Sequence, residues 1–265
     1  MNHNNLSEKF VDTSLVSIRE IPKDIAKDII IKNHYSHKWS LCTHAIGIFY
    51  KSGVEDCFFE TDEILIGCLV YGNPVGRSAA ASISEEIKPN EVLELVRLFI
   101  EDGYGKNIES YCIARSFDWI RKFRPDIRAL ISYADVEQNH RGGIYQATGW
   151  IYQGNSAMSL MPNYSVSLTN DPYEWIHSRT VFEKFGSHNI EHLKKTIGKT
   201  FYRKKESTKH RYVYFLGNKI DKKKLVKSMK HPAQPYPKGN CFVEEIETFV
   251  VDENPNKDKD SMFEI

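Results

Sequence analysis

An aspartate and a tyrosine in the middle of the chain have the chemistry of a proton-transfer pair. Asp135 ends the run Ser132-Tyr133-Ala134-Asp135, and Tyr145 follows shortly after it. A carboxylate at the end of a strand can act as a general base and a neighbouring tyrosine as a general acid. An aspartate at such a position can equally cap the following turn. The spacing alone leaves both roles of Asp135 open.

The sequence His34-Tyr35-Ser36-His37 and the residue Arg97 are further candidates. Two histidines three positions apart can share a helical face and bind a metal, or one of them can act as a base. The alternative is that they lie at a helix C-terminus, where the helix dipole favours histidine. Arg97 is a charge within an apolar strand, so it belongs either to a solvated face or to an anion-binding cleft.

A glycine-containing loop, Gly103-Tyr104-Gly105-Lys106, precedes a predicted helix that begins at Asn107. Free N–H groups and the positive end of the helix dipole make such a loop suitable for phosphate. The same pattern is also common in ordinary turns between a strand and a helix. Asn107 is expected to act as the N-cap.

Hydrophobic spacing predicts the elements that position these residues. Strands are expected at 43–50, 64–71, 92–100, 129–134, 150–153 and 211–216, and helices at 21–33, 107–123, 143–147, 173–184 and 221–230. The first two strands should be antiparallel neighbours. A right-handed crossover should place strands 92–100 and 129–134 side by side and parallel. In such an α/β sheet, ligands bind beyond the carboxyl ends of the strands.

The charge of the chain is distributed unevenly, although its net value is only +1. Residues 194–230 contain fourteen Lys or Arg and two acids, a local net charge of +12, whereas residues 241–265 have a net charge of −6. Aromatic residues lie among these basic residues, a pattern that favours nucleic acid. The alternative is a solvated basic face with tyrosines in the core of a small strand. The candidate DNA-binding residues are Arg203, Lys204, Lys205, Lys209 and Arg211.

The composition predicts an N-terminal arm (1–19), a catalytic core (20–155), a basic extension (156–240) and an acidic, largely disordered tail (241–265). The five cysteines are scattered without C-x-x-C spacing, which argues against a disulfide framework and against a thiolate zinc site. The apolar runs are too short to span a membrane, and the N-terminus lacks the pattern of a signal peptide. A cytoplasmic location without membrane contact is therefore expected.

An ordered set of short motifs resembles the Mom family of phage DNA-modification proteins. The set comprises His-Tyr-Ser at 34–36, Ile-Gly-Ile-Phe-Tyr at 46–50, Gly-Cys-Leu-Val-Tyr-Gly at 67–72, Glu-Leu-Val-Arg-Leu at 94–98, Asn107 with Glu109-Ser110, Ser132 with Ala134-Asp135, and Gly-Gly-Ile-Tyr-Gln-Ala at 142–147 with Gly149. The resemblance covers roughly residues 30–155. It implies an acetyltransferase-like (GNAT-like) fold, a mixed α/β sheet flanked by helices, here with a basic C-terminal extension.

The resemblance also implies an activity: a transferase that converts the N6 amine of adenine in DNA to a carbamoylmethyl-type derivative and so protects phage DNA from restriction. The implied functional positions are His34, Tyr35, Arg97, Ser110, Asp135 and Tyr145. Arg97 and Ser110, with Gly103, Gly105 and Asn107, would bind the group donor, either a CoA thioester or a glycine-like carrier. Iron, implicated in the family, would use His34, Tyr35 and Asp135.

The implied chemistry places demands on both protein and substrate. The adenine N6 amine is a poor nucleophile, so Asp135 would act as base and Tyr145 as acid or oxyanion donor. The target base must be flipped out of double-stranded DNA or lie in single-stranded DNA. A homodimer is compatible with the sequence. The rival functions are an acetyl-CoA-dependent N-acetyltransferase of a small amine or protein, and a non-catalytic DNA-binding protein.

Overall fold

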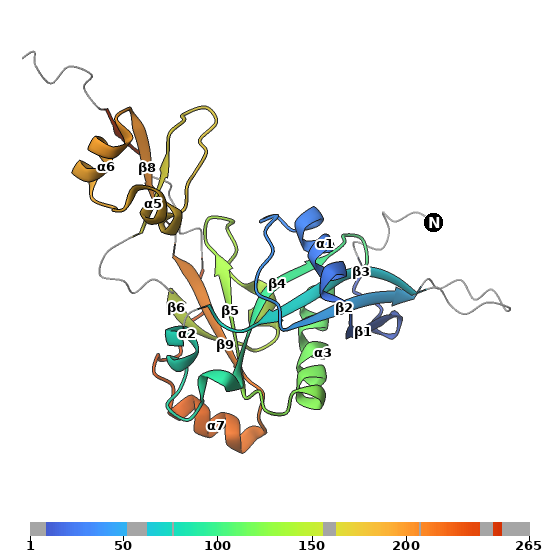
Figure 1. The fold of residues 1–265 in the computed structure, drawn as a ribbon. Coiled ribbons are helices and arrows are strands. Elements are labelled where there is room, and N and C mark those ends of the chain that lie inside the picture. The colour runs from blue at the N-terminus through green and yellow to red at the C-terminus, as the bar shows by residue number, and fades with distance from the viewer. Residues whose placement is uncertain are drawn as a thin grey trace, which may run out of the picture. The chain divides into compact units, whose positions relative to one another are not determined.

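The computed structural model describes residues 9–51, 63–75, 77–155, 163–206, 208–238 and 246–250. These residues form two compact units (Figure 1). The first, called the sheet unit below, contains Met1–Asp135, His140–Ser156 and Lys209–Lys238; the second, called the small unit, contains Val136–Asn139, Ala157–Thr208 and Gly239–Ile265. Each unit is described by itself.

The sheet unit is built on a seven-stranded mixed sheet with the strand order β1-β2-β3-β4-β5-β9-β6. The strands are β1 (Val16–Glu20), β2 (His44–Lys51), β3 (Glu63–Gly72), β4 (Val92–Ile100), β5 (Ala129–Asp135), β6 (Ile151–Asn155) and β9 (Lys209–Phe215). β4 and β5 pair in parallel, whereas the other neighbours are antiparallel. The expected antiparallel and parallel pairs and the α/β fold class are therefore confirmed.

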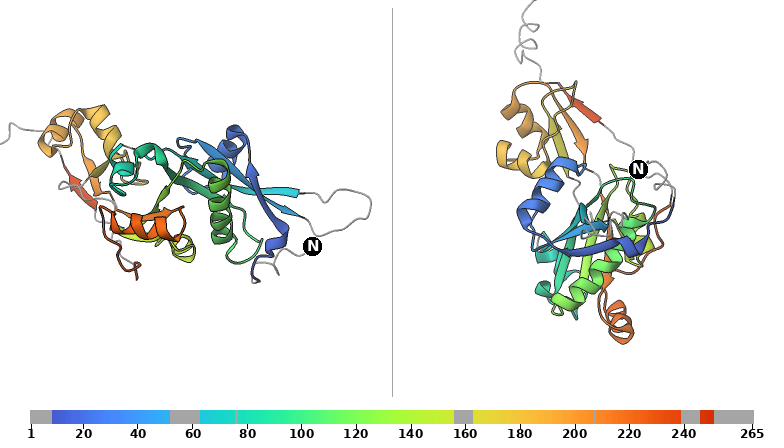
Figure 2. Two further views of the ribbon diagram at one scale, coloured as in Figure 1. Left: turned by 90° about the horizontal axis from the view of Figure 1, so that it is seen from below. Right: turned by 90° about the vertical axis from the view of Figure 1, so that its right-hand side faces the viewer.

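Helices cover both faces of this sheet (Figures 1 and 2). On one face, called the α1 face below, helix α1 (Lys23–Asn33) packs through Ala26 and Ile30 against Ala45, Cys68 and Val70. Helices α2 (Arg77–Ala81) and α7 (Lys219–Lys227) cover the other part of this face, through Ala80 and Leu225. Helix α3 (Ile108–Phe123) and the short α4 (Gly143–Ala147) lie on the opposite, α3 face.

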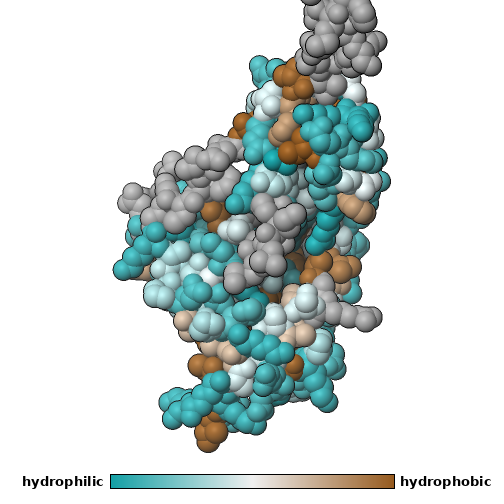
Figure 3. Space-filling view, turned by 90° about the vertical axis from the view of Figure 1, so that its left-hand side faces the viewer, coloured by the Kyte–Doolittle hydropathy of each residue, from teal (hydrophilic) through white to brown (hydrophobic). Residues whose placement is uncertain are grey.

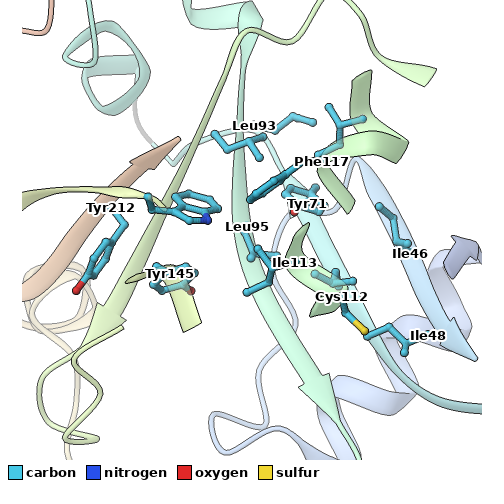
Figure 4. Packing of buried hydrophobic residues seen from close by; sticks show 14 of the residues in the cluster. Ile46, Ile48, Tyr71, Leu93, Leu95, Cys112, Ile113, Phe117, Tyr145 and Tyr212 are labelled. Atoms are coloured by element: carbon cyan, nitrogen blue, oxygen red, sulfur yellow. The ribbon is translucent and has the colours of Figure 1, made fainter. Parts of the chain in front are cut away.

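The main hydrophobic core lies between the sheet and α3 (Figure 4). The spacing of Ile113, Phe117 and Ile120 places all three on the buried side of α3. In Figure 4, Tyr145 and Tyr212 lie at one end of this core, and Ile46 and Ile48 lie at the other. The core therefore reaches along the α3 face from β2 to β9.

Strand β9 differs in position from the sequence expectation. The composition predicts that residues 156–240 form an extension outside the core, yet β9 lies inside the sheet, between β5 and β6. Its second half contributes hydrophobic side chains to both faces: Tyr212 packs on the α3 face, and Val213 and Phe215 pack on the α1 face. Strand β1 also belongs partly to the expected N-terminal arm. The core is thus not the contiguous segment 20–155.

The small unit contains a three-stranded antiparallel sheet in the order β10-β8-β7, with two helices. The strands are β7 (Tyr164–Ser167), β8 (Phe201–Lys205) and β10 (Ile246–Phe249), and the helices are α5 (Ser178–Phe185) and α6 (Ile190–Ile197). Its core consists of Val166, Val181, Leu193 and Phe201. Glu206 stabilises the start of α5 by accepting a hydrogen bond from the Ser178 backbone N–H at 2.7 Å.

Two expectations for the small unit are wrong in part. The helix expected at 173–184 begins only at Ser178, because the backbone of Ile176 is extended and exchanges hydrogen bonds of 2.8 and 3.0 Å with Val166. The tail expected to be largely disordered contains β10, which pairs with β8. The other tail residues, apart from Val250, lie outside the described part of the chain.

The surface in Figure 3 is mostly hydrophilic, and its hydrophobic side chains form small, separate patches. Among the residues that the structure describes, no helix is both long enough and apolar enough to cross a membrane.

Two phenylalanines on α3 provide a test of this packing. Phe117 is 3% exposed and Phe123 is 54% exposed. Phe117→Ala should lower the free energy of unfolding by about 3–5 kcal/mol, because it leaves a cavity against Tyr214, whose ring stacks on it at 4.0 Å. Phe123→Ala should cost less than about 1 kcal/mol. Urea denaturation of both variants measures the difference, and equal losses would contradict the assigned orientation of α3.

Candidate active site

Strands β4 and β5 form only a short parallel ladder. It joins Val92–Glu94 to Ala129–Ile131 and ends there, although both strands continue. Just beyond this point, Ser132 Oγ lies 2.8 Å from the Leu95 carbonyl oxygen and 2.8 Å from the Tyr145 hydroxyl. The serine hydroxyl is the donor in both contacts, so its single proton is shared between the Leu95 carbonyl and the Tyr145 hydroxyl. Tyr145 and Ser132 therefore fix the point where the two strands part.

A β-bulge in β4 determines where Arg97 points. Val70 pairs with Arg97 and Tyr71 pairs with Leu95, so Val96 is an extra residue in β4. The extra residue places Arg97 on the α1 face, where Val70 packs. There, Arg97 Nε donates to the Lys38 carbonyl at 3.3 Å and Nη1 donates to the Val96 carbonyl at 2.6 Å. Simple alternation of side chains along β4 would not predict this face.

His34 and Tyr35 follow the last residue of α1 on the same face of the sheet. His34 is buried, and its Nδ1 accepts a hydrogen bond from the Ser36 backbone N–H at 3.1 Å. Burial, followed by the positive charge of Arg97, lowers the pKa of His34 to about 4. The imidazole is therefore neutral near pH 7. Because Nδ1 acts as an acceptor, the proton of the neutral ring is on Nε2.

Tyr35 links the end of α1 to the end of β5. Its side chain is half-exposed, and its ring lies edge-on to His140 at 5.4 Å. Burial of the hydroxyl raises the pKa of Tyr35, and the negative charge of Asp135 raises it further, while Arg97 opposes the change. The structure therefore brings together Tyr35, Arg97 and Asp135, three of the residues predicted from the sequence.

Asp135 ends β5 on the α1 face, opposite Lys209 of β9. Lys209 Nζ lies 3.7 Å from the Asp135 carboxylate. The sequence predicts a DNA contact for Lys209, but the structure places it beside the candidate base. The two side chains form an ion pair across the β5–β9 ladder.

Glu94 is a site residue that the sequence analysis missed. It lies at the last position of the β4–β5 ladder and accepts a hydrogen bond from the Val75 backbone N–H at 3.4 Å. Burial raises the pKa of Glu94, although the Val75 N–H and the cations Lys209 and Arg97 oppose this change. The available signal was the same as for Arg97, a charge inside an apolar strand.

Tyr145 also has a perturbed pKa. Burial raises the pKa of Tyr145 to about 12; the hydrogen bond with Ser132 opposes this rise, and Tyr35 and Glu94 add to it. These electrostatic contributions show that Tyr35 and Glu94 lie near Tyr145, around the end of the β4–β5 ladder. Tyr35 thus interacts electrostatically with both members of the predicted pair, Tyr145 and Asp135.

The glycine-containing loop before α3 has the left-handed backbone that glycine favours: φ is 101° at Gly103 and 108° at Gly105. A Cβ on Gly105 would lie 2.7 Å from Val11 Cα, so the N-terminal segment explains this glycine. Lys106 N–H is also used by that segment, in a 2.7 Å hydrogen bond to the Lys9 carbonyl. The loop is therefore partly occupied by the chain itself.

Asn107 stands at the N-cap position of α3, but the expectation that its side chain caps the helix is wrong. Its backbone is left-handed, with φ of 67°, and its side chain makes no capping hydrogen bond. Ser110 Oγ donates to the Asn107 carbonyl at 2.9 Å. A groove beside this helix end is lined by residues that include Phe10, Lys106, Asn107, Ser110, Ala147 and Thr148.

The predicted donor-binding residues do not come together as one set. Gly103, Gly105, Asn107 and Ser110 lie at the start of α3, whereas Arg97 lies on the α1 face beside Lys38. The loop residues and Arg97 must therefore have separate roles.

The structure gives no support for the predicted iron ligands His34, Tyr35 and Asp135. In the described ranges, no three His, Cys, Asp or Glu side chains are placed to hold a metal ion. His34 and Tyr35 are adjacent, but His34 Nδ1 is an acceptor and Nε2 carries the proton, so no free lone pair faces outward. The expectation of an iron site gains no support from this geometry.

The predicted DNA-binding residues are largely engaged within the protein. Arg203 is bound to Glu247, stacks on Tyr164 at 3.9 Å, and has a side chain that is only 12% exposed. Lys204 lies 4.8 Å from the Trp175 ring centroid and has a side chain that is 14% exposed. Arg211 is buried. Of the five predicted residues, Lys205 and Lys209 are exposed, so the set is not one open basic surface.

The sheet unit is an α/β fold whose two parallel strands part beside a carboxylate and a tyrosine, side chains that can transfer protons. The model of the Mom protein family matches residues 15–238, and the chain therefore belongs to the Mom protein family. The family resemblance seen over residues 30–155 is confirmed and extends over most of the chain. The chain is also 26% identical over 216 residues to "Methylcarbamoylase mom" of Escherichia phage Mu, which covers 81% of this chain and 80% of that protein.

Solved structures similar to this one include N-acetyltransferases. A spermidine N-acetyltransferase from Vibrio cholerae, in complex with CoA and spermine, has a TM-score of 0.38 and 10% identity, with 77% of this chain and 97% of that chain covered. An N-acetyltransferase from Staphylococcus aureus Mu50 has a TM-score of 0.37 and 12% identity, with 77% and 99% covered.

The depressed pKa of His34 predicts a dependence of stability on pH. Between pH 6.5 and about 4 the unfolded chain protonates this histidine and the folded chain does not. Its contribution to stability is therefore complete above pH 6.5 and is lost as the pH falls to about 4. His34→Gln should reduce the acid-induced loss of stability, measured by urea denaturation from pH 7 to pH 4, whereas the exposed His188→Gln should not. An NMR titration midpoint for His34 near 6.5 would contradict the assignment.

Proposed function

We propose that this protein is a DNA-modifying transferase that adds a carbamoylmethyl-type group to the N6 amine of adenine. One observation carries the chemistry: Asp135, Tyr35 and Arg97 converge on the α1 face, at the point where β4 and β5 part. Membership of the Mom family, with a phage Mu relative called a methylcarbamoylase, supports adenine in DNA as the substrate. The modification would shield phage DNA from restriction.

Asp135 is the proposed base. As the adenine N6 forms a bond to the electrophilic carbon of the donor, the nitrogen must lose a proton, because its lone pair is otherwise delocalised into the ring. Asp135 takes that proton, and the leaving group departs with the electrons of the bond that breaks. The ammonium of Lys209 lies 3.7 Å from this carboxylate.

Tyr35 is better placed than Tyr145 to act as the proton donor. Tyr145 is buried and its hydroxyl is hydrogen-bonded to Ser132, so a substrate reaches it less easily than it reaches Tyr35. The half-exposed Tyr35 lies near Asp135. We therefore assign Tyr145 a positioning role, through Ser132, and assign the donor role to Tyr35.

The donor is proposed to be a CoA thioester, with a glycine-like carrier as the alternative. The groove at the start of α3 supports an anionic donor, because Lys106 and Ser110 line it beside the positive end of the helix dipole. These two residues would hold the phosphates of such a donor. Attack of N6 on its thioester carbonyl would expel the CoA thiolate and give an N6-acyl adenine, whereas a carbamoylmethyl product, bonded through its CH2 carbon, would require the leaving group on that carbon. A Cβ on Gly103 would meet no atom within 4 Å, so the loop leaves room there.

Single-stranded DNA or a flipped adenine of double-stranded DNA is the proposed acceptor. Exposed cations near the candidate base support phosphate contacts: Lys38 follows α1, Arg141 follows β5, and Lys209 begins β9. The lysines of α7 follow the far end of β9, roughly 20 Å from Lys209 at the rise of an extended strand. We propose that residues around Lys209, rather than α7, contact the DNA that is being modified.

The activity is tested by expressing the protein in bacteria and digesting the host DNA to nucleosides. Mass spectrometry should detect a heavier deoxyadenosine. Acetyl-CoA consumption with a small amine, together with unmodified adenine in the DNA, would instead favour an ordinary N-acetyltransferase and overturn the proposal.

Asp135→Asn should reduce the heavier deoxyadenosine by about 10²–10⁴-fold, the usual contribution of a general base. DNA binding should stay nearly intact, as measured by fluorescence anisotropy. Asp118→Asn is the matched control, because it removes an equal charge from the exposed side of α3, where Asp118 pairs with Arg115 and Arg121. Full activity of Asp135→Asn would refute the assignment of the base.

A further inference from the structure

Arg211 is a buried cation with unsatisfied hydrogen-bonding capacity. It lies in β9 and is 8% exposed. Its Nε and Nη2 have no hydrogen-bond partner among the described residues. Buried guanidinium groups normally pair with a carboxylate, a phosphate or carbonyl groups, because an unpaired buried charge destabilises the folded state. Arg203, by contrast, is fully engaged with Glu247 and Tyr164.

The two unsatisfied atoms of Arg211 form one edge of the guanidinium. The N–H bonds of Nε and Nη2 are parallel and point the same way, which is the geometry that binds two oxygens of a carboxylate or phosphate at once. Two free donors on one edge are a more specific feature than two unrelated unsatisfied atoms. They match an oxyanion.

Gln153 carries a second unsatisfied group, and both Gln153 and Arg211 lie close to His231. Gln153 is buried, its Nε2 donates to the His231 carbonyl at 3.0 Å, and its Oε1 has no partner among the described residues. Burial and then the positive charge of Arg211 lower the pKa of His231, which shows that Arg211 approaches it as well. Free donors and a free acceptor are therefore gathered in one place.

This polar cluster adjoins the candidate active site. Tyr133 pairs with Arg211 and Asp135 pairs with Lys209 along the same β5–β9 ladder. Side chains two residues apart on a strand share a face and are separated by roughly 7 Å. Arg211 therefore lies one side-chain step inward from the Asp135–Lys209 pair, on the α1 face, where Val213 of the same strand also packs.

We propose that Arg211 is the anion-binding residue of the substrate site: its Nε and Nη2 edge holds a carboxylate or phosphate oxyanion of a substrate, and Gln153 Oε1 accepts an N–H or O–H of the same molecule. This inference rests on the proposed function, because it assigns a subsite to that reaction. The oxyanion would come either from a carboxylate of the group donor or from a phosphate of the nucleotide.

The test is an NMR titration of the full chain, observing arginine Nε–H resonances. The probes are inorganic phosphate and deoxyadenosine 5′-monophosphate for a phosphate source, and acetate and glycine for a carboxylate source. The Arg211 signal, assigned by its absence in Arg211→Lys, should shift saturably with one pair of probes. The Arg203 signal is the internal control and should not move, because Arg203 Nε donates to Glu247 at 2.7 Å.

Two results would overturn the inference: an Arg211 signal that none of the four probes shifts, and a shift that Arg203 shares. A stronger response to glycine than to acetate would support the role of Gln153, and Gln153→Leu should remove that difference. Arg211→Lys keeps the charge but lacks the paired donors, so it should weaken binding at least tenfold. If it does not fold, the Arg211 signal is assigned in the wild-type protein by through-bond NMR experiments, and the wild-type titration decides.

Failure of this inference can be separated from failure of the proposed function. Saturable binding at Arg211 without a modified deoxyadenosine would retain the subsite and reject the function. A wild-type yield of modified deoxyadenosine from Arg211→Lys would retain the function and reject the subsite.

Discussion

The hydroxyl of Ser132 makes the hydrogen bonds on which the site depends. It is hydrogen-bonded to the Leu95 carbonyl and to the Tyr145 hydroxyl, at the end of a parallel ladder that joins β4 and β5 over only three residue pairs. Beyond that point β4 carries the bulge that turns Arg97 toward the α1 face, and β5 ends at Asp135. A buried hydrogen bond in a medium of low dielectric constant holds such an arrangement firmly, because breaking it would leave polar atoms without partners.

Local sequence patterns predicted the elements but not all of their relations. The strand, helix and strand from 92 to 134 follow from hydrophobic spacing, and the parallel pairing follows from the handedness of crossovers. The face of Arg97 could not be predicted, since one extra residue in β4 reverses the alternation. The neighbour of β5 could not be predicted either, since β9 lies far along the chain and pairing at such a separation leaves no local signal.

The charge asymmetry shows how composition can mislead at the level of single residues. The basic segment is real, yet Arg203 binds Glu247, Lys209 lies beside Asp135, and Arg211 is buried within the sheet unit. Counting charges gives the net charge of a segment. It does not show which of its cations are buried or already form ion pairs within the protein. Glu94 was missed for the complementary reason: one acid in an apolar strand hardly changes any average, although its environment raises its pKa.

The order of the strands along the chain has a consequence for assembly and for dissection of the protein. The sheet unit receives β9 only after β7 and β8 of the small unit have been made, and the small unit receives β10 only after α7 of the sheet unit. Each unit therefore needs a segment that is synthesised after part of the other. No single cut in the chain yields two complete units, and removing the residues after Lys238 would leave β8 with an unpaired edge open to another strand.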